Sequence, residues 1–93
     1  MSEKKTSNNR EVIVMMDDRE LKFEIGLADY NNCINKMQQK NKVQPIHMFL
    51  ISCAADDDTK AAVKECYEDA LTMDLFGEVL EGYKPKVEFT VKK

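Results

Sequence analysis

The segment NKVQPIHMFLISCAADDDTK, residues 41–60, places a nearly continuous apolar run between a proline and three consecutive aspartates. Pro45 is tolerated in the first turn of a helix, because its missing N–H would be unpaired there. The residues that follow are apolar on nearly every side, which indicates an element buried in the centre of the protein. Since methionine, leucine and alanine favour helices, we interpret the run as a central buried helix, with a buried strand as the alternative.

The acidic run Asp56–Asp58 precedes a second segment with helical periodicity, TKAAVKECYEDAL, residues 59–71. Acidic side chains at the start of a helix accept hydrogen bonds from free backbone N–H groups and favour the positive end of the helix dipole. We therefore interpret the three aspartates as a helix start. The calcium-binding pattern of EF-hands is absent, so the run does not indicate a cation site.

Residues 11–25 predict a β-hairpin with its turn at DDRE, residues 17–20. The second strand alternates between charged and apolar side chains over residues 20–25, which is typical of a strand with one buried face. The first strand is apolar throughout residues 12–16. Since Val12, Val14 and Met16 share one face, Ile13 and Met15 are left on the opposite, open face.

The C-terminal residues 86–93, KVEFTVKK, alternate in the same way, with Val87, Phe89 and Val91 on one side. Helical periodicity fills the region between the hairpin and this segment, and Gly82 is placed to end the last helix. We therefore predict an α+β fold with an N-terminal hairpin and three to four helices. A C-terminal strand would complete a three-stranded antiparallel sheet, with the helices on the face that carries Phe23 and Phe89. Residues 1–10 are expected to be a flexible tail, and residues 11–93 a single domain.

The charge of the chain is unevenly distributed. Residues 1–10 carry a net charge of +2 and residues 84–93 carry +3, which leaves −8 for residues 11–83. Proteins that bind nucleic acid usually present a basic face on the folded body, so this pattern disfavours nucleic acid as a partner. The longest apolar run is far shorter than the roughly 20 residues of a membrane helix, and the N-terminus lacks the apolar core of a signal peptide.

Residues that carry chemistry are few and widely spaced. Cys33, Cys53 and Cys66 show no short metal-binding spacing, and each falls on an apolar helix face, so we expect reduced, buried thiols and no metal or other cofactor. The single histidine, His47, is expected to pack at the start of the central helix. Glycine patterns that bind phosphate are absent. The sequence therefore predicts a protein that is not an enzyme.

A binding function remains, and two features favour it. Ile13 and Met15 would form a small apolar patch on the open face of the sheet, and the six methionines of the chain are flexible enough to repack around varied apolar partners. The alternative for the patch is that the N-terminal tail or a second copy of the chain covers it.

The stretch ELKFEIGLADYNNCINKMQQKNKVQPIHMFL, residues 20–50, resembles the small tail assembly chaperones of long-tailed bacteriophages and prophages. In these proteins a short hairpin precedes an Ala-Asp-Tyr-Asn helix and an Asn-Lys-Val-x-Pro-x-His segment, found here at residues 28–31 and 41–47. An acid-started helix and a C-terminal Tyr-x-Pro-x-Val-Glu-x-Thr-Val strand follow, the latter at residues 83–91. The family has a proline–glycine break between its last two helices. Residues 65–77 lack it, which predicts a more continuous pair of helices here.

The resemblance implies a function in phage assembly. It implies a chaperone that binds the tape measure protein, gathers tail-tube protein around it in the cytoplasm of the bacterial host, and is absent from the mature virion. On this interpretation Ile13 and Met15, or a free strand edge, bind the client or a second copy of the chain. Two alternatives stay open: a small phage regulatory protein that binds a host or phage transcription factor, and a structural component of the particle.

Overall fold

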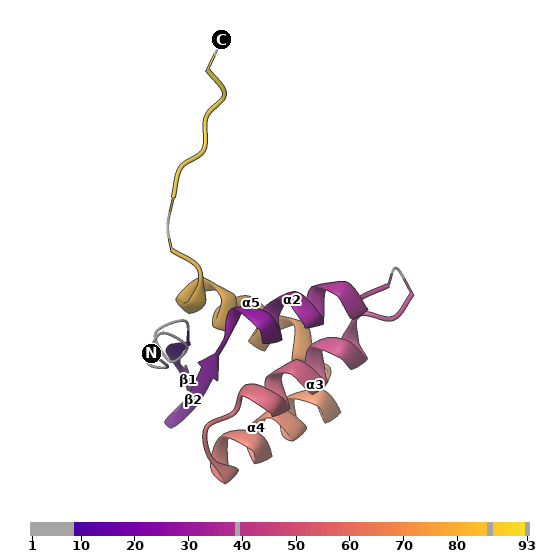
Figure 1. Ribbon diagram of the computed structural model, residues 1–93. Coiled ribbons are helices and arrows are strands. Elements are labelled where there is room, and N and C mark those ends of the chain that lie inside the picture. The colour runs from indigo at the N-terminus through magenta and orange to yellow at the C-terminus, as the bar shows by residue number, and fades with distance from the viewer. Residues whose placement is uncertain (1–8, 39, 86, 93) are drawn as a thin grey trace, which may run out of the picture.

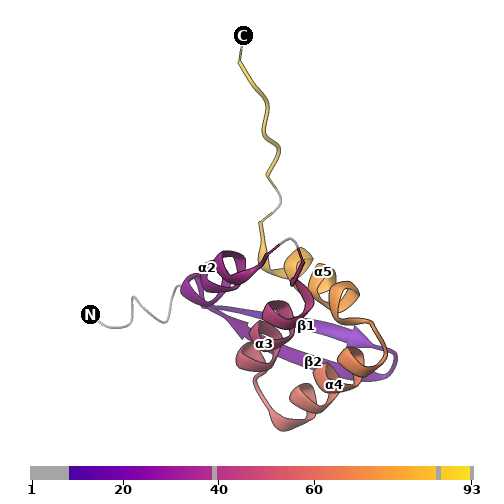
Figure 2. The ribbon, with the colours of Figure 1, turned by 90° about the vertical axis from the view of Figure 1, so that its right-hand side faces the viewer.

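The computed structural model describes residues 9–38, 40–85 and 87–92, and a hairpin followed by four helices makes up its folded body. The elements are β1 (Arg10–Met16), β2 (Arg19–Ile25), α2 (Leu27–Lys36), α3 (Val43–Cys53), α4 (Asp57–Glu68) and α5 (Thr72–Tyr83). The hairpin forms one layer and the helices cover one of its faces (Figures 1 and 2). The predicted α+β class and N-terminal hairpin are confirmed. Residues 1–8 of the predicted tail lie outside the described residues, and Arg10 already belongs to β1.

The two strands pair antiparallel in a register that places Val12 opposite Phe23 and Met16 opposite Arg19. Only Asp17 and Asp18 lie between the strands, so the turn is a two-residue one. Asp17 has a φ of 56°, in the left-handed region that the hairpin turns of two residues require and that aspartate tolerates better than most side chains. The turn chemistry therefore agrees with the register that buries the Val12 face.

The core lies between the buried face of the hairpin and α3. Phe23 and Ile25 of β2 have no exposed surface, nor do Ile46 and Leu50 of α3. The central helix packs against β2 and against each of the other three helices. Phe49 of the same helix lies edge-on to the ring of Phe76, at 6.0 Å between centroids. The prediction of a central buried helix is confirmed.

The start of α4 is fixed by the acidic run and joined to β2. The Asp56 carboxylate accepts a hydrogen bond of 2.8 Å from the backbone N–H of Thr59, and hydrogen bonding with Thr59 lowers the pKa of that carboxyl. Thr59 is fully buried, and its hydroxyl oxygen accepts a 3.0 Å bond from the N–H of Lys22. The N–H of Ala55 donates to the Lys22 carbonyl at 2.9 Å. The connection between α3 and α4 thus occupies the outer edge of β2.

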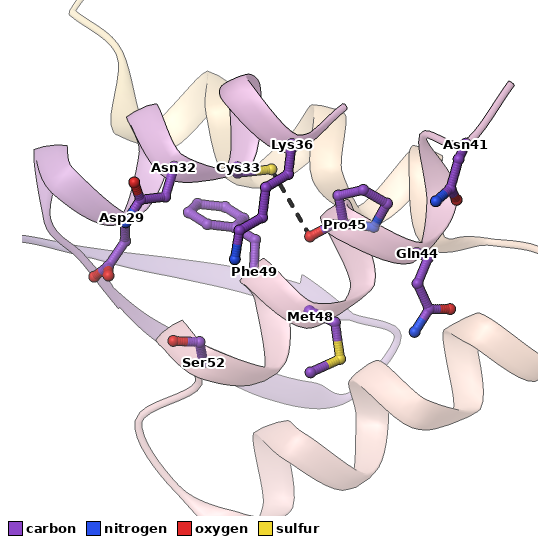
Figure 3. A pocket seen from close by; sticks show the side chains of 10 residues that line it. All are labelled: Asp29, Asn32, Cys33, Lys36, Asn41, Gln44, Pro45, Met48, Phe49 and Ser52. Atoms are coloured by element: carbon purple, nitrogen blue, oxygen red, sulfur yellow. Dashed lines mark hydrogen bonds between the residues drawn. The ribbon is translucent and has the colours of Figure 1, made fainter. Parts of the chain in front are cut away.

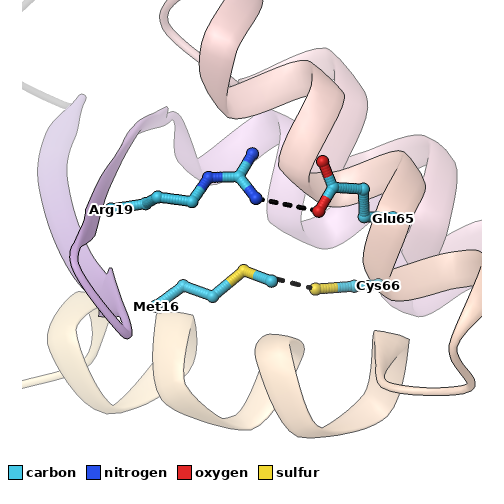
Figure 4. A network of polar contacts seen from close by, with 4 residues as sticks. All are labelled: Met16, Arg19, Glu65 and Cys66. Atoms are coloured by element: carbon cyan, nitrogen blue, oxygen red, sulfur yellow. Dashed lines mark hydrogen bonds and ion pairs between the residues drawn. The ribbon is translucent and has the colours of Figure 1, made fainter.

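Two side-chain contacts join the hairpin turn to α4 (Figure 4). Arg19 donates from Nη1 to Glu65 Oε1 at 2.8 Å, and this ion pair lowers the pKa of the Glu65 carboxyl. The two side chains are 42% and 49% exposed, so water screens the pair and it contributes little to stability. The Sγ atom of Cys66 lies 4.0 Å from the Sδ atom of Met16, at the edge of the core. The turn is therefore held mainly by packing.

A sharp break separates α4 from α5, and the prediction that these helices are more continuous is wrong. Ala70 has a φ of 64°, the N–H of Leu71 donates to the Cys66 carbonyl at 2.7 Å, and the N–H of Ala70 donates to the Tyr67 carbonyl at 3.4 Å. This bond pattern is a Schellman motif, which usually has glycine at the left-handed position. The break forms here without glycine or proline, and α5 begins at Thr72, where the polar residues Thr72 and Asp74 predict the start of the last helix.

Replacing Ala70 with glycine is expected to stabilise the protein. The left-handed conformation costs a residue with a Cβ about 1–2 kcal/mol, and glycine removes this cost. Because glycine also gives the unfolded chain more freedom, we expect a net gain of about 0.5–1 kcal/mol, measured by urea unfolding. Ala61→Gly, at an exposed position inside α4, is the matched control and should lose about 1 kcal/mol. A loss of stability in Ala70→Gly would contradict the strained conformation.

Gly82 does not end α5 as predicted, because the helix continues through Tyr83. A Cβ atom at position 82 would lie 2.7 Å from Cγ1 of Val12, closer than real Cβ contacts come. The glycine therefore allows α5 to approach β1 closely.

The predicted C-terminal strand is wrong. Residues 87–92 have no regular secondary structure, and the described part of the chain contains a two-stranded sheet. Val87, Phe89 and Val91 are 59%, 89% and 84% exposed, so Phe89 does not face the helices. In Figures 1 and 2 this segment extends away from the folded body.

Chain geometry explains why the segment does not add an antiparallel strand to its own sheet. The Arg10 side chain donates to the Tyr83 carbonyl at 3.0 Å, so α5 ends beside the first residue of β1. An antiparallel neighbour of β1 would have to begin at the other end of that strand, about 20 Å away. Residues 84–86 span only about 10 Å. The C-terminal segment does alternate as a strand would, but the connection from α5 is too short to bring it to the far end of β1.

Candidate protein-binding surface

The face of the hairpin opposite the helices carries two large apolar side chains among charged ones. Ile13 is 49% exposed and Met15 is 60% exposed. The strand register places Ile13 opposite Lys22 and Met15 opposite Glu20. The structure therefore brings both predicted residues together on the open face, where the sequence placed them. We call this set the hairpin face; it comprises Glu11, Ile13, Met15, Glu20, Lys22 and Glu24.

The free edge of β1 adjoins the hairpin face. Both backbone groups of Lys22 bond away from β1, to Thr59 and Ala55, so Lys22 and its partner Ile13 form a non-hydrogen-bonded pair. In such a pair the N–H and C=O groups of both residues point outward. By the same alternation, Glu11 and Met15 direct their backbone groups outward. No hydrogen bond joins these groups to another element within residues 9–38, 40–85 and 87–92.

A groove of about 450 Å³ runs along this edge, between β1 and α5. Its strand wall is formed by residues 12–15, and its helix wall by Glu78, Glu81 and Gly82. One wall thus offers apolar side chains and unpaired backbone groups, and the other offers two carboxylates. Sequence patterns did not predict the contribution of α5, because residues 17–71 separate it from β1.

A second groove, of about 510 Å³, lies between α2 and α3 (Figure 3). Cys33 donates from Sγ to the Pro45 carbonyl at 3.9 Å at its base, and Phe49 lies beneath it. The rim carries opposite charges, from Asp29 and Lys36. The remaining lining residues are polar or flexible: Asn32, Asn41, Gln44, Met48 and Ser52. No pair of these side chains forms a nucleophile and its base.

The three cysteines are free thiols in the buried part of the protein. Burial raises the pKa of all three, and it raises that of Cys53 to about 12. A thiol is nucleophilic and binds metal ions as the thiolate, so burial disfavours the reactive form of these side chains. Their role is to fill space, as the sequence predicts for small apolar residues.

His47 is half-buried and packs on Tyr67, with 4.3 Å between the ring centroids. The Tyr67 hydroxyl in turn donates to Gln44 Oε1 at 3.3 Å. Cys53, at the other end of α3, lies about 9 Å along the helix axis from His47, and the acidic run Asp56–Asp58 follows beyond that end. The structure therefore does not bring the histidine and the aspartates into one site.

Two further features of the structure bear on metal binding and on membrane insertion. Within the described ranges, no group of three or more histidine, cysteine, aspartate or glutamate side chains is arranged to hold a metal ion. Among the helices described, none has both the length and the apolar character needed to cross a membrane.

Comparisons with known proteins place the chain among phage proteins. An uncharacterized 11.3 kDa protein in the lys 3′ region of Haemophilus phage HP1 (strain HP1c1) is 29% identical over 65 residues, which cover 70% of this chain and 64% of the relative. The chain thus spans less than two thirds of that relative's length. No solved structure is significantly similar. The sequence profile of the phage tail assembly chaperones matches residues 12–93, which include every helix and nearly all of the hairpin. The protein therefore belongs to the phage tail assembly chaperone family.

Proposed function

We propose that the protein binds the tape measure protein of its phage and assists the assembly of tail-tube protein around it, through the hairpin face and the free edge of β1. Membership of the tail assembly chaperone family supports the general function. The observation that carries the specific proposal is the exposure of Ile13 and Met15 beside a strand edge with which no described residue pairs.

The chemistry of the surface suits a reversible contact with an apolar client. Ile13 and Met15 are about half exposed, so covering each contributes about half of the 1.5–3 kcal/mol of full burial, or roughly 0.8–1.5 kcal/mol, which gives weak binding per site. The carboxylates of Glu11, Glu20 and Glu24 surround them and keep the face soluble while it is empty. Such a protein acts in the cytoplasm of the bacterial host and leaves before the virion is complete, because a transient contact is easily released.

Changing Ile13 and Met15 together to serine is expected to reduce co-purification with the tape measure protein at least about tenfold. The reason is the loss of roughly 1.5–3 kcal/mol of apolar burial at the contact, since both side chains are about half exposed before binding. Both proteins would be co-expressed in the bacterium, and the amount of tape measure protein retained on the tagged chaperone would be measured. The melting temperature should stay nearly unchanged, because both side chains are exposed in the folded protein.

Leu27→Ser with Ile34→Ser is the matched control, since these two apolar residues of α2 are similarly exposed, at 56% and 39%, but lie outside the hairpin face. This variant should retain the tape measure protein at the level of the unchanged chain. Equal losses in both variants would mean that binding depends on general surface hydrophobicity. An unchanged yield in the Ile13 and Met15 variant would refute the proposed surface.

A further inference from the structure

Among the residues that the structure describes, the chain carries a strand edge without a pairing partner and, separately, an unpaired segment with the pattern of a strand. The edge is that of β1, where the backbone groups of Glu11, Ile13 and Met15 point outward. The segment is residues 87–92, which lies away from the folded body with its apolar side chains exposed. An exposed edge is a template for a further strand, and main-chain bonds then supply much of the affinity.

We propose that residues 87–92 of a second copy of this chain pair antiparallel with the free edge of β1, and that the exchange is reciprocal. The two copies then form a dimer with a single continuous antiparallel sheet across a two-fold axis. The two exchanged segments lie side by side at its centre. This proposal goes beyond the proposed function and does not depend on the identity of the client. The exchanged segment and the client compete for the edge of β1, so the dimer is the form of the protein without client.

Chain geometry favours a second copy over the same chain as the acceptor. The segment leaves α5 beside Arg10, so within one chain it reaches the edge of β1 only as a parallel neighbour. In the exchanged arrangement β1 of one copy and β1 of the other run in opposite directions. The segment of each copy then starts at the level of its own Arg10, two strand positions away from its own β1. Two strand spacings amount to about 10 Å, a distance that three residues such as 84–86 are long enough to cross. Every neighbour in the resulting sheet is antiparallel.

The side chains of the segment complement those of the groove. Placing Val87, Phe89 and Val91 on the open face sets them beside Ile13 and Met15, which extends the apolar strip across the sheet. The even-numbered side chains Glu88, Thr90 and Lys92 then face the groove, where Lys92 meets the acidic wall formed by Glu78 and Glu81. Glu88 and Lys92 give residues 87–92 no net charge, so the electrostatic attraction to that wall comes from Lys92 alone.

The outer edge of β2 does not compete for the segment. Thr59 and Ala55 already bond to both backbone groups of Lys22 there, and a bridge joins Phe23 to Ala54. Each copy therefore offers one acceptor edge and one donor segment, which suits a closed pair.

Sedimentation velocity of the purified full chain, over a series of concentrations and without any client, tests the proposal. The unchanged chain should form a dimer. Phe89→Ser should raise the dissociation constant at least about tenfold, because it removes the largest apolar side chain from the contact. Leu27→Ser, at an exposed apolar residue outside the contact, should leave the constant unchanged. A chain that stays monomeric at all concentrations would overturn the proposal.

A cross-linking experiment determines which copy supplies the segment. A photoreactive phenylalanine analogue at position 89 would be introduced into the chain, and ¹⁴N- and ¹⁵N-labelled copies would be mixed before irradiation. We expect linked peptides that join position 89 of one label to residues 11–15 of the other. Links confined to a single label, or links to no residue of β1, would overturn the exchange. Because no tape measure protein is present, failure here leaves the proposed function standing, and success does not establish it.

Discussion

Replacing Phe23 with alanine is expected to destabilise the protein by about 3–5 kcal/mol, the range found when a buried phenylalanine is truncated. Phe23 has no exposed surface and lies on β2 at the point where the sheet meets the α3–α4 connection. Small domains have only about 5–15 kcal/mol of total stability, so the variant should be largely unfolded near physiological temperature. Urea unfolding monitored by circular dichroism measures the change.

Phe89→Ala provides a matched control for this substitution, since the same side chain is removed at a position that is 89% exposed. At dilute concentration its free energy of unfolding should equal that of the unchanged chain. Phe23→Leu should lie between the two, because leucine fills part of the space. Similar losses at positions 23 and 89 would show that the C-terminal segment packs on the body of its own chain.

Two glycines of the same helix are expected to respond to alanine with opposite signs. Gly82→Ala places a Cβ atom 2.7 Å from Cγ1 of Val12, a short, stiff side chain on a strand that cannot move away easily. Overpacking of this kind costs about 1–3 kcal/mol. A gain of up to about 1 kcal/mol from helix propensity partly offsets it. At Gly77 a Cβ atom meets nothing within 4 Å, so Gly77→Ala should stabilise by about 0.5–1 kcal/mol.

Combining Gly82→Ala with Val12→Ala tests whether the contact between positions 82 and 12 causes the loss of stability. Val12→Ala alone loses buried apolar surface, but it removes the atom that obstructs a side chain at position 82. The loss in the double variant should therefore be smaller than the sum of the two single losses, by about 1 kcal/mol or more. Thermal or urea unfolding of the four proteins in the cycle gives this value. Strict additivity would mean that α5 shifts freely and does not press on β1.

The sequence predicted those parts of the fold that depend on local patterns. The alternation of residues 20–25 predicted the second strand and its buried face. The acidic run before Thr59 predicted the start of α4. The face of Ile13 and Met15 followed from the same alternation, because a strand with one covered face has only one open face.

The parts that could not be predicted depend on contacts between distant segments. Residues 87–92 have the alternation of a strand, but whether they pair is decided by where α5 ends, beside Arg10. The break at Ala70 depends on a backbone conformation that composition favours only when glycine is present. The acidic wall of the groove could not be foreseen either, because nothing in residues 78–82 indicates that they lie against β1.

The bonds that Lys22 makes to Thr59 and Ala55 set a limit on how this protein aggregates. Fibrils grow when both borders of a sheet accept new strands. In this protein the outer edge of β2 is already hydrogen-bonded to the α3–α4 connection. A new strand can therefore add only at the edge of β1, and addition ends after one neighbouring molecule has joined. One edge of the sheet can thus stay available for a partner strand without the protein itself becoming a seed for amyloid.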